Sequence, residues 1–223
     1  NVGTQADPHY TLRGVAALSA GDDFTLVETE KHQVLRFGKF TSRDGDSATS
    51  VYHPVYLRMA EDSGSTDILK NVQSMGAGSR HGVLVTGTLA GGDNAVWAFG
   101  LNTSGQLGNG YATKQDANNN RVDSEYGASR VISPEENYTP DVIYEKDVIQ
   151  VSAGGGQSVL YKQDGAVWNM GAGDKGQLGH GSYNGNYLPV RVGTASNESI
   201  KADKMTVLEG GKAVVVYTYG TGS

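Results

Sequence analysis

The chain repeats itself, and this repetition limits its possible folds more than any other feature. An Ala-Gly pair followed by an apolar run begins at Ala20, Ala77 and Ala153, and a Glu-Gly pair at Glu209 begins a fourth copy. The glycines of these pairs lie at positions 21, 78, 154 and 210, so the copies are 57, 76 and 56 residues apart. A period of roughly 50 residues is typical of chains that stack similar units side by side, as solenoids and propellers do.

Each copy continues with further fixed residues. Apolar runs that end in glycine follow at Val34–Gly38, Val96–Gly100 and Val167–Gly171. Two copies then share the sequence Gly-Gln-Leu-Gly-x-Gly, at 105–110 and 176–181. The residues that define the repeat, for which we expect a structural role, are Gly21, Gly38, Gly78, Trp97, Gly100, Gly105, Gln106, Leu107, Gly108, Gly154, Trp168, Gly171, Gly176, Gln177, Leu178 and Gly179.

The repeated units consist of short strands and turns. Val83–Val85 and Val148–Val151 are apolar runs of strand length, and Asp164-Gly165 supplies the positive φ of a tight hairpin turn. No segment has the apolar spacing of an amphipathic helix. Because short, evenly spaced strands with periodic glycine and aromatic residues are typical of propellers, we predict an all-β fold: a β-propeller of four-stranded antiparallel blades, about three and a half of them in this chain.

We expect one partial propeller over residues 1–223. The repeats divide it into the end of a preceding blade, three repeats and a truncated fourth, at 1–14, 15–70, 71–146, 147–200 and 201–223. Blades are stabilised by their neighbours, so an open wedge leaves two blade faces and the propeller axis exposed to water. The expected partner is therefore a protein, either further repeats of the same protein or another chain completing the propeller.

The second repeat is the longest because of an insertion at 111–145. Loops of this length in compact folds are often functional, and this one is rich in tyrosine and arginine, which are common in recognition surfaces. We expect the insertion to contact a partner; the alternative is a spacer or a flap over the rim of the ring. The candidate partner-binding residues are Tyr111, Arg121, Tyr126, Arg130, Tyr138 and Tyr144.

No combination of residues predicts catalysis. His81 lies near Ser79 but lacks an orienting carboxylate and a nucleophile elbow, so we expect a hydrogen-bonded interior histidine. Gly171–Gly176 matches the dinucleotide-binding pattern but is not followed by a helix. Asp116–Glu125 spaces its oxygen atoms as a calcium loop does, but Arg121 stands where that loop requires glycine. We predict no enzyme activity and no cofactor, with calcium as the open alternative.

Composition excludes further classes of function. The chain has no Cys, which removes disulfides, thiolate zinc sites and cysteine nucleophiles. Its 18 Lys and Arg against 24 Asp and Glu give a net charge of −6, the wrong sign for binding nucleic acid. No apolar run reaches the roughly 18 residues of a membrane span, so no membrane insertion is expected. The absence of Cys, the acidic charge and the many Gly, Asn, Thr and Tyr residues favour a secreted or cell-surface protein of bacterial type.

The motifs Ala-Gly-x-x-His, Val-Trp-x-x-Gly and Gly-Gln-Leu-Gly-x-Gly, in this order, resemble the repeats of the regulator of chromosome condensation family. The resemblance extends from about Leu12 to Gly220 and is strongest at 147–192. It implies a β-propeller, typically seven-bladed in that family, and the bacterial secreted and surface members are the type that this chain resembles. The first copy departs from the pattern, with Phe24 where histidine is frequent and Leu35 where tryptophan is usual.

Propellers hold loops on a rigid platform, and function resides in the surfaces so presented. We therefore expect a non-enzymatic extracellular scaffold or protein-binding propeller, acting through its blade faces and the 111–145 insertion as part of a larger ring or assembly. The resemblance implies an alternative, a soluble protein-binding inhibitor or a guanine-nucleotide-exchange-like propeller.

Overall fold

The computed structural model describes residues 11–41, 48–59, 67–87, 94–111, 114–115, 121–122, 124–134, 144–193, 204–207 and 214–217. Throughout these residues the chain forms strands, turns and isolated bridges, and none of them is helical. The all-β prediction is confirmed.

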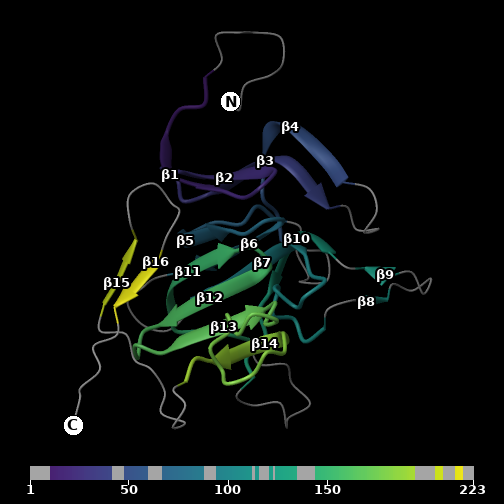
Figure 1. The fold of residues 1–223 in the computed structure, drawn as a ribbon. Coiled ribbons are helices and arrows are strands. Elements are labelled where there is room, and N and C mark those ends of the chain that lie inside the picture. The colour runs from purple at the N-terminus through teal and green to yellow at the C-terminus, as the bar shows by residue number, and fades with distance from the viewer. Residues whose placement is uncertain are drawn as a thin grey trace.

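Three four-stranded antiparallel sheets, which we call blades 1, 2 and 3, form the body of the molecule (Figure 1). Blade 1 consists of β1 (Val15–Ala20), β2 (Phe24–Thr29), β3 (Val34–Thr41) and β4 (Ala48–Tyr56). Blade 2 consists of β5 (Val72–Ala77), β6 (His81–Thr86), β7 (Ala95–Leu101) and β10 (Ser124–Arg130). Blade 3 consists of β11 (Val148–Gly154), β12 (Gln157–Lys162), β13 (Val167–Gly171) and β14 (Asn186–Arg191).

The blades are arranged radially. Their first strands, β1, β5 and β11, lie next to one another, and blade 2 lies between blades 1 and 3 (Figure 1). Two short hairpins add the remaining strands, β8 (Lys114–Gln115) with β9 (Arg121–Val122), and β15 (Lys204–Val207) with β16 (Val214–Tyr217). This arrangement of antiparallel blades around one side of an axis is a partial β-propeller.

Most of the apolar core lies between the blades. Trp97 and Phe99 of β7 pack against blade 1, where Phe24 meets Phe99 edge to face with ring centroids 6.2 Å apart. Trp168 and Met170 of β13 pack against blade 2 in the same way. Because the third strands of blades 2 and 3 direct their largest side chains at the preceding blade, these two blades depend on their neighbours for burial.

Each blade has a glycine in its third strand for a steric reason. Gly38, Gly100 and Gly171 have φ values of 113°, 97° and 107°, a range that side chains avoid. A Cβ at these positions would lie 2.3, 2.5 and 2.2 Å from the backbone oxygen of Asp23, Arg80 and Gly156, respectively. Glycine is therefore required for two reasons: its backbone angle, and the close approach of the residue that precedes the second strand.

Replacing Gly171 by alanine is expected to lower the free energy of unfolding by at least about 2 kcal/mol, through backbone strain and a clash with the Gly156 carbonyl. Gly181→Ala is the matched control, because Gly181 also has a positive φ, 82°, but no atom within 4 Å of an added Cβ. Urea unfolding of the two variants separates the two effects. Equal losses would mean that the carbonyl contact contributes nothing.

Candidate functional site

Neighbouring blades are joined by the same backbone contact at both interfaces. The Asp22 N–H donates to the Ser79 oxygen at 3.2 Å, and the Ser79 N–H donates to the Gly155 oxygen at 2.9 Å. Each of these three residues follows the anchor glycine of its repeat. We call the side of a blade toward the next blade, which donates at this position, its forward face, and the side toward the preceding blade, which accepts, its backward face.

The two outermost faces carry apolar side chains at positions whose equivalents in the other blades are buried in the interfaces between blades. On the forward face of blade 3, Ile149, Val159 and Val192 are partly buried beside Tyr161 and Val167. On the backward face of blade 1, Leu18 is 61% exposed, whereas Val27 and Leu35, which follow it in register across the sheet, are buried. Leu18 is the fourth residue of its strand, as Met75 and Val151 are of theirs, and these two pack in the blade 1–2 and blade 2–3 cores.

A buried polar bridge reinforces the interface between blades 2 and 3. The Ser158 hydroxyl donates to the Gln106 carbonyl at 2.8 Å, so its oxygen accepts from the His81 Nε2–H at 2.9 Å. His81 is completely buried, and burial lowers its pKa to about 4, against the opposite effect of a hydrogen bond with the Gln157 backbone. The side chain is therefore a neutral link between blades at physiological pH.

Two of the six predicted partner-binding residues meet at one surface. The Arg130 guanidinium lies 5.4 Å from the centroid of the Trp97 ring and 4.7 Å from that of the Tyr144 ring. Burial lowers the pKa of Arg130, and Tyr144 acts in the opposite direction, yet an arginine remains charged. Because the stack fixes Tyr144, which is 41% exposed, it presents a rigid aromatic side chain of the kind that anchors protein interfaces.

The other four candidates lie elsewhere or are not described. The Tyr111 carbonyl accepts a hydrogen bond from Asn102 Nδ2 at 2.7 Å, beside the Gly-Gln-Leu-Gly turn. Arg121 belongs to β9 and Tyr126 to β10, while Tyr138 lies outside the described residues. Part of the segment 111–145 is thus regular structure, since β10 is the outer strand of blade 2.

Strand pairing reveals a tyrosine that occupies the same place in every blade. Gly38, Gly100 and Gly171 of the third strands pair with Val51, Glu125 and Asn186 of the outer strands. The next residue is Tyr52, Tyr126 or Tyr187. Tyr52 and Tyr187 are exposed, and they are not among the residues predicted from the sequence. A signal for them is present in the sequence, because Tyr52, Tyr126 and Tyr187 precede the apolar residues Leu57, Val131 and Val192, respectively, by the same number of residues.

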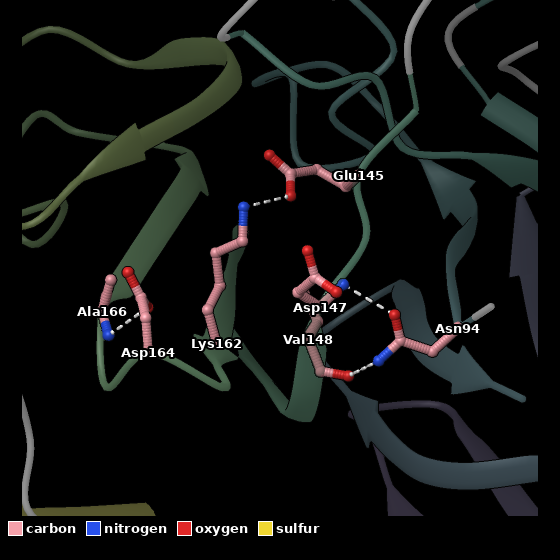
Figure 2. Close-up of polar contacts among 7 residues, drawn as sticks. All are labelled: Asn94, Glu145, Asp147, Val148, Lys162, Asp164 and Ala166. Carbon is pink, nitrogen blue, oxygen red and sulfur yellow. Dashed lines mark hydrogen bonds and ion pairs between the residues drawn. The ribbon is translucent and has the colours of Figure 1, made fainter. Parts of the chain in front are cut away.

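A polar cluster lies where the chain passes from blade 2 to blade 3 (Figure 2). Asn94 accepts from the Asp147 N–H at 2.6 Å and donates to the Val148 carbonyl at 2.7 Å. Glu145 and Lys162 form an ion pair at 3.0 Å, with 0% and 12% of their side chains exposed. The Lys162 ammonium also lies 5.1 Å from the centroid of the Trp168 ring. The segment after Tyr144 is thereby fixed to blade 3.

Two cavities accompany these contacts. One, of about 320 Å³, runs between the first strands of the three blades and includes Leu18, Met75 and Val151. The other, of about 400 Å³, opens beside the polar cluster, and its walls are formed by Asp147, Lys162, Gln163, Asp164, Trp168 and Arg191. The second cavity holds both charged and aromatic groups, as small-molecule sites often do.

The described residues contain no group of three or more His, Asp or Glu side chains placed to hold a metal ion. Residues 116–120, which carry most of the possible calcium ligands, lie outside that part of the chain. Within the same described part, no helix is long and apolar enough to cross a membrane.

Comparison with known proteins agrees with the repeat and the fold. Residues 164–206 match the family model of the regulator of chromosome condensation (RCC1) repeat. Yeast RCC1 (Prp20) bound to Kap60 is similar in structure, with a TM-score of 0.61 and 17% identity over 87% of this chain and 40% of that chain.

Two further crystal structures are similar. Prp20p from Saccharomyces cerevisiae, described with its binding properties to Gsp1p and histones, has a TM-score of 0.62 and 18% identity over 87% of this chain and 42% of that one. Human WBSCR16 has a TM-score of 0.55 and 22% identity over 86% of this chain and 44% of that one. The present chain thus spans less than half the length of these structures.

Proposed function

Because the chain carries RCC1 repeats folded as propeller blades, we propose that it is a non-enzymatic, extracellular protein-binding scaffold. It acts through its blade faces and the segment 111–145, as part of a larger ring or assembly. The cysteine-free, acidic composition supports the extracellular setting. The binding of Gsp1p and histones described for Prp20p supports protein as the class of partner.

The observation that carries this proposal is the complementarity of the two outermost faces. Blade 3 offers Val159 and Ile149 on its forward face, and blade 1 offers Leu18 on its backward face. In the two interfaces inside the chain, equivalent surfaces are buried against each other. Since both outermost faces follow that pattern, the surface that fits each of them is another blade of the same kind.

Native mass spectrometry of the purified chain tests the proposal. We expect assemblies larger than the monomer at micromolar concentration, because a forward face of one copy fits the backward face of another. Leu18→Asp and Val159→Asp each place a charge on one face and are expected to weaken assembly at least tenfold. Tyr183→Asp is the control, because Tyr183 is 76% exposed on a loop after β13.

Mixing the two face variants gives the sharper result. Each variant retains one intact face, so an equimolar mixture is expected to form a dimer that neither variant forms alone. A wild-type chain that stays monomeric at 100-fold higher concentration would contradict the proposal, as would a mixture that behaves like its separate components.

A further inference from the structure

The dipeptide Asn-Gly occurs twice in the chain, as Asn109-Gly110 and as Asn184-Gly185. Asparagine is a thermolabile residue, and a following glycine makes it more so, because glycine has no side chain to hinder the approach of its backbone nitrogen to the asparagine amide. In a folded protein the reaction also requires that this nitrogen and this amide are accessible and free to move. The surroundings of the two dipeptides therefore decide which of them reacts.

The first dipeptide is held between blades 2 and 3. The Gly110 N–H donates to the Tyr187 carbonyl of β14 at 3.0 Å. The Asn109 side chain is buried, and its Oδ1 accepts from Asn102 Nδ2 at 2.9 Å. Since both groups are engaged away from water, Asn109 reacts only when the contact between the two blades opens.

The second dipeptide has no such protection. Asn184 and Gly185 are exposed, in the loop that joins β13 to β14. The Asn184 N–H donates to the Ser182 hydroxyl at 3.1 Å. Among the residues that the structure describes, however, neither the Asn184 side-chain amide nor the Gly185 N–H has a hydrogen-bond partner. Water thus reaches both reacting groups in the folded chain.

We propose that Asn184 is a site of spontaneous modification, where the folded chain converts asparagine into aspartate and isoaspartate. The Gly185 nitrogen loses its proton and bonds to the side-chain carbonyl carbon of Asn184. The bond from that carbon to the amide nitrogen breaks, ammonia leaves, and a five-membered succinimide remains. Water opens the ring at either carbonyl, which gives aspartate or isoaspartate. The reaction needs no partner protein, so it is independent of the proposed scaffold function.

The isoaspartate product alters the attachment of the outer strand of blade 3. The Asn184 carbonyl packs so closely on Gly173 that a Cβ at Gly173 has no room. Two residues later, Asn186 pairs with Gly171 of β13. In isoaspartate the main chain runs through the former side chain and gains one carbon between these two contacts. One of the contacts must shift, and the start of β14 is loosened.

Peptide mapping by mass spectrometry tests the site. The purified chain is incubated at mildly alkaline pH, and Asn184 is expected to be modified at least tenfold faster than Asn109. Incubation in urea that unfolds the chain is the control, because both dipeptides then lose their surroundings and should react at similar rates. Equal rates in the folded chain would overturn the proposal, as would an Asn184 rate that rises tenfold or more on unfolding.

Asn184→Asp separates the new charge from the longer main chain. This variant carries the carboxylate but a normal backbone, and the side chain that it replaces is exposed, so it is expected to unfold at the urea midpoint of the wild type. The isoaspartyl form, separated from aged protein by ion exchange, is expected to unfold at a lower midpoint. An isoaspartyl form as stable as the Asn184→Asp variant would contradict the loosening of β14.

Discussion

Replacing Lys162 by methionine is expected to lower the free energy of unfolding by about 3–5 kcal/mol. Its partner Glu145 is completely buried, and the two form an ion pair at 3.0 Å (Figure 2). Removal of the ammonium leaves a carboxylate away from water without its counter-charge, which is far more costly than the loss of an exposed pair. Urea unfolding followed by far-UV circular dichroism measures the effect.

The double variant Lys162→Met with Glu145→Leu is the control for this prediction. Replacing both members of a buried pair by apolar groups of similar size is often neutral or stabilising, so the double variant should recover most of the lost stability. If the single variant is as stable as the wild type, water reaches Glu145 and the pair is not the link between blades 2 and 3 that its burial indicates.

Acidification from pH 6.5 to pH 4 is expected to destabilise the fold by about 3 kcal/mol through His81 alone. Burial lowers its pKa from 6.5 to about 4 in the folded chain. Between these pH values the unfolded chain binds a proton that the folded chain excludes, so stability falls as pH falls. Well below pH 4 both states are protonated and the loss no longer grows.

His81→Gln isolates this contribution from that of all other titrating groups. Gln157 occupies the equivalent position in blade 3, so the repeat itself accepts an amide there. The difference in unfolding free energy between wild type and variant, measured at several pH values from 7 to 4, should shrink as pH falls. A difference that stays constant would show that His81 does not titrate in this range.

The fold was predictable because its main signals are local. Gly38, Gly100 and Gly171 occupy positions in the third strands at which a side chain does not fit, and these positions recur in the sequence with the repeat. The apolar runs that precede them need no partner outside the repeat to be recognised as strands. The number and order of the strands can therefore be predicted from these local signals, without knowledge of how the blades pack.

The candidate site was less predictable because it depends on register and on contacts between repeats. The outer strand β10 has few apolar residues, so the segment 111–145 looks like one long loop in the sequence. Only the pairing of β10 with β7 shows that part of this segment is a strand. The ion pair of Glu145 and Lys162 joins residues from different repeats.

The hydrogen-bonded series from Asp22 through Ser79 to Gly155 has a direction, since blade 1 donates to blade 2 and blade 2 donates to blade 3. An interface with this sense cannot be related to itself by a two-fold axis, so in the proposed assembly copies of the chain would add head to tail. Such growth has only two outcomes, a closed circle or an open fibre, and the rotation between successive blades selects between them. A single copy with one blocked face would then act as a terminator, limiting fibre length from one end only.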